Sequence, residues 1–150
     1  MAFDPKLVEA KLALQRVGPE ELPNLACDAL EAGLDGPWIR RLASLINPSG
    51  WETDQILPKF MAETGLCQLT RAEASLRVAR DLATRILSQD LDPLSFAGDF
   101  LRLWIDADYM DVLQKAGCLD DRIAIADALG QTEDELRDYA RNVLTELTSS

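Results

Sequence analysis

The chain has 150 residues and a hydrophobic content of 47%, enough for one globular domain over residues 1–150 to bury a core without disulfides or a bound metal. It contains no histidine, which excludes Ser-His and Cys-His nucleophilic catalysis and removes the commonest ligand of transition metals. The formal net charge of −11 disfavours contact with nucleic-acid phosphates and favours basic protein partners, or simply solubility.

Turn and capping residues divide the first 48 residues into three predicted helices. A capping residue followed by proline marks a helix start, and glycine or an X-Pro pair marks the end of an apolar stripe. The helix starts lie at 4–5, 18–19 and 35–37, and the stops lie at 18–19, 33 and 47–48.

The next predicted helix, before Gly65, has a less certain beginning. Ser49 and Glu52 have the spacing of a capping box, yet Pro58 lies too deep for an unkinked helix. We therefore expect this helix either to start near Asp54 or to bend at Pro58.

Residues 70–88 form the clearest predicted helix, opened by a capping box of Thr70 and Glu73. Its outer face is basic, with Arg71, Arg77, Arg80 and Arg85. We expect a solvated face of mixed charge. The alternative is that these arginines pair with acidic residues from the second half of the chain.

Residues 92–105 are predicted to form the central helix. Asp92 supplies the cap, Pro93 the first helical position, and the following residues are apolar on nearly all sides. We expect this helix to pack against 71–88 and 133–147.

Short helices are predicted up to Gly117 and then from Asp120 or Asp121 to Gly130, before a last helix opened by Thr132 and Glu135. No segment has the alternation typical of a β-strand. The sequence therefore predicts an all-α fold, a single-domain irregular multi-helix bundle of about eight or nine helices.

Two segments carry a family resemblance: ALEAGLDGPWIRRLASL (29–45) and ILSQDLDPLSFAGDFLRLW (86–104). They resemble a loose group of small, uncharacterised, all-helical bacterial proteins with an ALEAG-Asp-Ser-Pro-x-Leu-Arg-x-Leu-Ala segment and a later Leu-Asp-Pro helix start. Gly36 replaces the usual serine, and Trp38 fills a small-residue position. The resemblance implies a bacterial helical domain and no activity.

The three cysteines, Cys27, Cys67 and Cys118, include no CxxC pair, so neither a disulfide framework nor a zinc knuckle is predicted. We expect them to be buried or inert, with Cys118 the most exposed. Trp38 and Trp51 follow turns and are expected to pack in the core, one of them partly exposed. The alternative is that they anchor an interface.

The string WIDADYMD (104–111) has the Asp-x-Asp spacing of haloacid-dehalogenase-like phosphatases, but it lacks the strand context and has Met110 at the position of the required Thr or Val. It also lacks the glycine and the twelfth-position glutamate of a calcium-binding EF-hand loop. A carboxylate-based, metal-dependent enzyme that uses the carboxylates between Asp99 and Asp111 remains the alternative function.

The function we expect is a non-enzymatic, acidic protein-binding or regulatory module of bacterial type, comparable to an immunity protein, an antitoxin or an adaptor. Residues 90–138 contain thirteen acidic and four basic residues, and this negative charge favours a basic protein partner. We expect no cofactor, no nucleic acid and no membrane contact, whereas self-association is allowed. The first residues show no signal peptide, so the expected location is the cytoplasm. The candidate partner-binding residues are Asp106, Asp108, Asp111, Asp120, Asp121, Trp38 and Trp51.

Overall fold

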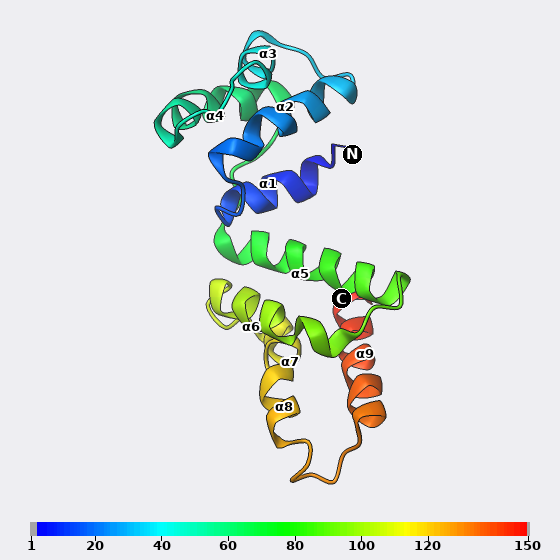
Figure 1. Ribbon diagram of the computed structural model, residues 1–150. Coiled ribbons are helices and arrows are strands. Elements are labelled where there is room, and N and C mark those ends of the chain that lie inside the picture. Colours follow the sequence, from blue (N-terminus) through cyan, green and yellow to red (C-terminus); the bar gives the residue numbers. More distant parts are fainter. Residues whose placement is uncertain (1–2, 150) are drawn as a thin grey trace. The chain divides into compact units, whose positions relative to one another are not determined.

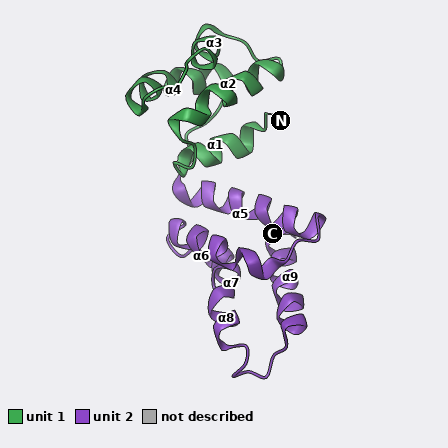
Figure 2. Ribbon diagram, in the orientation of Figure 1, with its two compact units in different colours: residues 1–69 green, residues 70–150 purple. Residues whose placement is uncertain are grey.

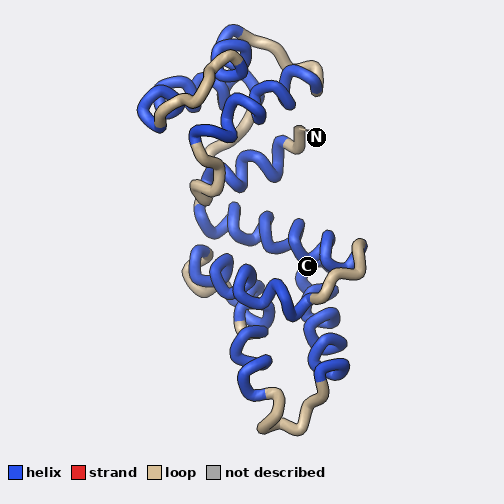
Figure 3. The backbone as a smooth tube through the Cα atoms, in the orientation of Figure 1, coloured by secondary structure: helices blue, strands red, loops and turns tan. Residues whose placement is uncertain are grey.

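The computed structural model describes residues 3–149, and no β-strand occurs within that range (Figure 3). The predicted all-α fold is confirmed. The chain forms two compact units, unit 1 with residues 1–69 and unit 2 with residues 70–150 (Figure 2). The single domain expected over residues 1–150 stays a prediction.

Unit 1 begins its helices where the sequence places caps. The Asp4 carboxylate accepts from the Leu7 amide at 3.3 Å, which satisfies a backbone donor that the first turn leaves free. Gly33 ends the second helix with a positive φ of 92°, a conformation that glycine adopts without steric cost. The elements are α1 (Pro5–Ala13), η1 (Pro19–Glu21), α2 (Leu22–Glu31), α3 (Pro37–Ala43) and α4 (Gly50–Thr64) (Figure 1).

Helix α4 starts at Gly50, earlier than the start near Asp54 that was one of the two predicted alternatives. The capping box is present, because the Ser49 hydroxyl accepts from the Glu52 amide and the Glu52 carboxylate accepts from the Ser49 amide. The helix continues through Pro58, so a start near Asp54 is wrong. The capping box satisfies two backbone donors and so stabilises a helix start at Gly50, although Pro58 then lies inside the helix.

The core of unit 1 lies between α1, α2, α3 and α4, and Phe60 is its largest fully buried side chain. A carboxylate from α4 also closes the start of α3: Glu63 Oε1 accepts from the amides of Trp38 and Ile39 at 2.8 and 2.9 Å. Gly36 makes this approach feasible, since a Cβ there would overlap the Glu63 carboxylate. Glu63 is thus a cap supplied by a distant helix.

In unit 2, α5 contacts both α6 and α9, while α7 and α8 pack on α6 (Figure 1). Small residues on the inner face of α5 allow this close approach, among them Ala74, Ala79 and Ala83, each fully buried. The elements are α5 (Arg71–Ser88), η2 (Pro93–Phe96), α6 (Ala97–Asp106), η3 (Asp111–Leu113), α7 (Gln114–Gly117), α8 (Leu119–Ile125) and α9 (Glu133–Ser149).

The predicted central helix differs from expectation in two ways. Residues 93–96 form a 3-10 turn, capped by Asp92 as predicted, and this turn contacts α9. Helix α6 contacts α5, α7 and α8 and shares a small buried cluster with α9 through Ala97 and Ala140. In addition, α6 is not surrounded: Phe100 and Leu103 are buried, but Ile105 is 48% exposed. The neighbours of α6 cover one broad side of it, so an apolar surface remains open to solvent. The predicted helix up to Gly130 is also shorter, since α8 ends at Ile125.

Candidate functional site

The chain reverses direction at the end of α6, through a backbone conformation that is unusual for these residues. Asp108 and Tyr109 both have positive φ angles, 54° and 61°, and a tyrosine rarely adopts this left-handed region. The amide of Asp108 donates to the Ile105 carbonyl at 3.0 Å, and the amide of Tyr109 donates to the Trp104 carbonyl at 2.9 Å. These bonds satisfy the helix end and hold the turn in place.

This turn displays apolar and acidic side chains together. Ile105, Tyr109 and Val112 are 48%, 56% and 48% exposed, and the carboxylates of Asp108 and Asp111 are exposed beside them. The Tyr109 ring rests edge-on against Trp104, with centroids 5.0 Å apart. We call residues 105–112 the acidic turn. An exposed aromatic ring with apolar neighbours, bordered by carboxylates, matches the apolar centre and polar rim of a protein interface.

Asp106 differs from the expected exposed carboxylate. Its side chain is only 21% exposed and forms an ion pair with Arg71, whose Nη2 lies 3.0 Å from Asp106 Oδ1. The pair borders a shallow hollow of about 460 Å³ lined by Arg71, Ala72, Ile105, Asp106, Ala107 and Asp108. Arg71 of the basic face therefore pairs with an acidic residue from the second half of the chain. Such pairing was the predicted alternative to a solvated face.

Two further arginines of α5, Arg80 and Arg85, have partners outside the acidic turn. Arg80 Nε donates to the Leu147 carbonyl of α9 at 3.3 Å, and Arg85 pairs with Asp81 of its own helix at 3.2 Å. The basic face is thus largely engaged within unit 2, and Arg71 is its link to the acidic turn.

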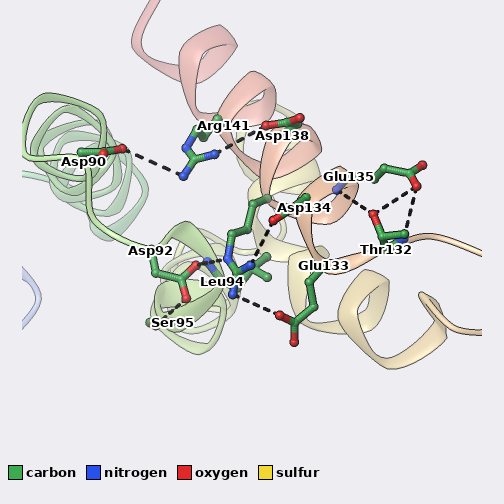
Figure 4. Close-up of polar contacts among 11 residues, drawn as sticks. Asp90, Asp92, Leu94, Ser95, Thr132, Glu133, Asp134, Glu135, Asp138 and Arg141 are labelled. Atoms are coloured by element: carbon green, nitrogen blue, oxygen red, sulfur yellow. Dashed lines mark hydrogen bonds and ion pairs between the residues drawn. The ribbon is translucent and has the colours of Figure 1, made fainter.

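Two arginines of α9 compensate part of the charge between residues 90 and 138 (Figure 4). Arg137 pairs with Asp92 at 3.3 Å and with Glu133 at 3.4 Å, while Arg141 lies between Asp90 and Asp138. Desolvation lowers the pKa of Arg137, but its hydrogen bond to Asp92 and the nearby carboxylates outweigh that effect and raise it. The negative field of this region is therefore uneven, and Asp108 and Asp111 lie outside this arginine network.

Asp120 and Asp121 are exposed in the first turn of α8, where a carboxylate complements the partial positive charge of a helix start. They are separated in sequence from the acidic turn by α7. Helix electrostatics therefore accounts for carboxylates at these two positions as well as partner binding does.

The carboxylates proposed for a metal-dependent enzyme do not converge. Among residues 3–149, no group of three or more Asp, Glu or Cys side chains is arranged to hold a metal ion. Asp106 turns toward Arg71, while Asp99 and Asp111 are exposed on separate elements. The geometry gives this alternative no support.

Unit 1 contains the two candidate tryptophans, and they differ. Trp38 is half-buried on the unit 1 core, and its ring is covered by two cations, Lys59 Nζ at 4.0 Å from the centroid and the Arg41 guanidinium at 5.5 Å. Trp51 is 73% exposed, and nearby in sequence Ile46 is 87% exposed. Core packing is wrong for Trp51, because it lies on the solvent side of the first turn of α4.

The cysteines also differ from expectation. Cys27 and Cys67 are exposed and Cys118 is intermediate, so of the two alternatives, buried or inert, burial does not hold for the first two, and Cys118 is not the most exposed. That the exposed cysteines are inert stays a prediction. Cys27 lies on the outer side of α2, opposite the buried Ala26 and Ala29 stripe, and helical periodicity places it there.

Sequence reasoning missed Ile105, Tyr109 and Val112 as surface residues. A usable signal existed for Ile105: the buried residues Phe100, Leu103 and Ala107 follow one helical stripe, which Ile105 does not share. The left-handed turn at Asp108 and Tyr109 has no comparable local signal.

No helix of the described chain is long and apolar enough to cross a membrane. Comparisons with protein-family models, with curated proteins and with solved structures give no match for this chain.

Proposed function

We propose that this chain is a non-enzymatic acidic module that binds a basic protein, in the manner of an immunity protein, an antitoxin or an adaptor. The observation that supports it is the acidic turn. Three apolar side chains stand exposed there beside the carboxylates of Asp108 and Asp111, on a backbone fixed by hydrogen bonds to the end of α6.

The two kinds of side chain have separate roles in this proposal. Exposed carboxylates attract a basic partner over a distance and raise its association rate. On contact, Tyr109 and Ile105 then bury their exposed apolar surface against the partner, which slows dissociation. A fixed turn loses little conformational entropy on binding, which favours affinity.

Salt separates the two roles experimentally. The Debye length is about 8 Å at physiological ionic strength, so steering by exposed carboxylates weakens as salt rises. Burial of Tyr109 is not screened in this way. We therefore expect the association rate to fall with salt, while the dissociation rate changes less.

The test begins with a pulldown from the native host, followed by association rates of the recovered partner at two salt concentrations. Neutralising Asp108 and Asp111 to Asn should slow association and flatten its salt dependence. Glu31→Gln with Asp54→Asn is a matched control, because it removes the same charge from exposed positions of unit 1. Equal rates and equal salt slopes for the two double variants would contradict the acidic turn as the interface and direct attention to Trp38 and Trp51.

A second pair of variants separates this proposal from long-range charge alone. Tyr109→Ser should accelerate dissociation without changing the salt slope, whereas Ile46→Ser, which removes an exposed apolar side chain from unit 1, should leave dissociation unchanged. Equal dissociation rates for Tyr109→Ser and the wild type would remove the apolar part of the interface.

A further inference from the structure

The hollow beside the acidic turn has the chemistry of a site for an arginine side chain. Asp106 and Asp108 bring carboxylates to it, and Ile105, Ala72 and Ala107 bring apolar surface. An arginine suits such a lining, because its aliphatic stem packs on apolar surface while its guanidinium pairs with carboxylates.

A guanidinium already lies at the edge of this hollow. Arg71 Nη2 donates to Asp106 Oδ1 at 3.0 Å, with the Arg71 side chain 68% exposed and the Asp106 side chain only 21% exposed. The carboxylate is thus the shielded partner of the pair, and the arginine is the solvent-exposed one. Because most of the Arg71 side chain already lies in solvent, an incoming cation can replace its guanidinium at small cost.

The backbone adds to the same field. Asp106 is the last residue of α6, whose C-terminal end carries partial negative charge. The hollow therefore combines two carboxylates and a helix end of the same sign. Arg71 at its edge opposes a second cation until it moves away.

We infer that Arg71 occupies, in the free protein, a subsite that an arginine of the basic partner takes over on binding. This inference rests on the proposed function and names the partner chemistry: a basic segment that presents arginine to Asp106 and Asp108. Arginine is preferred to lysine because its planar fork can meet two carboxylate oxygens at once.

The experiment measures the affinity of the full chain for a fluorescein-labelled, capped peptide of six arginines, by fluorescence anisotropy at low salt. Arg71→Gln should tighten binding about fourfold, the range expected from removal of one exposed ion pair. Arg85→Gln is the matched control: it removes the same charge from the same helix, where Arg85 pairs with Asp81. It should change the affinity much less.

Two further measurements test the site. In the Arg71→Gln background, Asp106→Asn should abolish the gain, and a melting curve checks that this variant folds. Asp108→Asn, at an exposed position, should reduce the gain without a folding concern. A peptide of six lysines should gain less from Arg71→Gln than the arginine peptide does.

The outcomes separate this inference from the proposed function. Equal tightening by Arg71→Gln and Arg85→Gln, with Asp108→Asn and Asp111→Asn still weakening the peptide, would overturn the arginine subsite and leave the acidic turn as the interface. Peptide binding that ignores Asp108→Asn, Asp111→Asn and Arg71→Gln alike would overturn both. A gain that survives Asp106→Asn would also remove the subsite.

Discussion

Units 1 and 2 hold their elements together by different polar contacts. In unit 1, a carboxylate from one element accepts from backbone amides of another: Glu63 from Trp38 and Ile39, and Glu9 from Cys67 at 2.8 Å. In unit 2, side-chain ion pairs connect the elements, as between Arg71 and Asp106, Lys115 and Glu146, and Arg137 and Asp92.

The difference bears on function. A carboxylate bound to backbone amides is fixed by the fold, whereas an exposed ion pair can exchange partners and is screened by salt. Residues 1–69 have six basic and ten acidic residues, against nine and sixteen in residues 70–150. Unit 2 therefore has the larger charge imbalance together with the more exchangeable contacts, which suits a binding surface.

The largest expected effect comes from the core of each unit. Phe60 and Phe100 are 0% and 1% exposed, and replacing either by alanine should lower the free energy of unfolding by about 4 kcal/mol through lost burial and a cavity. Hydrogen exchange measured by NMR gives the response of each unit separately. For the single domain that we expect, either substitution accelerates exchange in both units. Acceleration confined to the substituted unit would contradict a single domain.

The next effect concerns the contact between α6 and α7 in unit 2. A Cβ at Gly117 would lie 2.6 Å from Trp104 Cβ, so Gly117→Ala should destabilise by about 2 kcal/mol through overpacking. Gly98→Ala in α6 is the control, because nothing lies within 4 Å of its Cβ position. It should leave stability unchanged or raise it by about 0.5 kcal/mol. Urea unfolding measures both, and equal effects of the two substitutions would mean that Trp104 yields easily.

The comparison of polar contacts is tested directly by salt. Glu63→Ala leaves two backbone amides of α3 without their acceptor and should cost about 1.5 kcal/mol. Arg137→Gln removes ion pairs that are partly open to solvent and should cost less. In urea unfolding at low and high NaCl, the Glu63 penalty should stay nearly constant while the Arg137 penalty shrinks. Equal salt dependence would remove the distinction between the units.

Several helix starts could be predicted because the capping side chain and the backbone amide it accepts from lie two or three positions apart. The start of α3 is different, since its acceptor, Glu63, comes from another helix. The capping pairs Ser49 with Glu52 and Thr132 with Glu135 are formed as expected, since local hydrogen bonds of this kind follow from sequence spacing alone. The all-α class follows from the same signals repeated along the chain.

The contacts that define the candidate site could not be predicted, because they join distant residues. Arg71 and Asp106 are 35 positions apart, and nothing in either neighbourhood specifies the other. Tyr109 lies in the segment predicted to form a short helix up to Gly117, yet its φ angle of 61° is left-handed and its side chain is 56% exposed. Its exposure depends on how α6 packs between α5 and α7, which is a tertiary property.

The smallest expected effect is a pH-dependent one in unit 1, where Asp35, just before α3, forms an exposed ion pair with Arg40 of α3. Arg40 Nε donates to Asp35 Oδ1 at 2.7 Å, and this hydrogen bond lowers the pKa of Asp35 below its ordinary value of 3.8. A carboxyl whose pKa is lowered by folding stabilises the fold above its unfolded pKa, and that contribution is lost as pH falls through the folded pKa. Asp35→Asn should therefore destabilise slightly near about pH 6 and match the wild type near about pH 2.

Arg40→Gln should raise the pKa of Asp35 toward its ordinary value, measured by NMR titration of the carboxyl carbon. An unchanged Asp35 titration in Arg40→Gln would show that the backbone amide of Gly36, which also donates to this carboxylate at 2.9 Å, holds the pKa by itself. That result would extend to this exposed site the pattern seen at Glu63, in which unit 1 fixes its carboxylates through backbone amides.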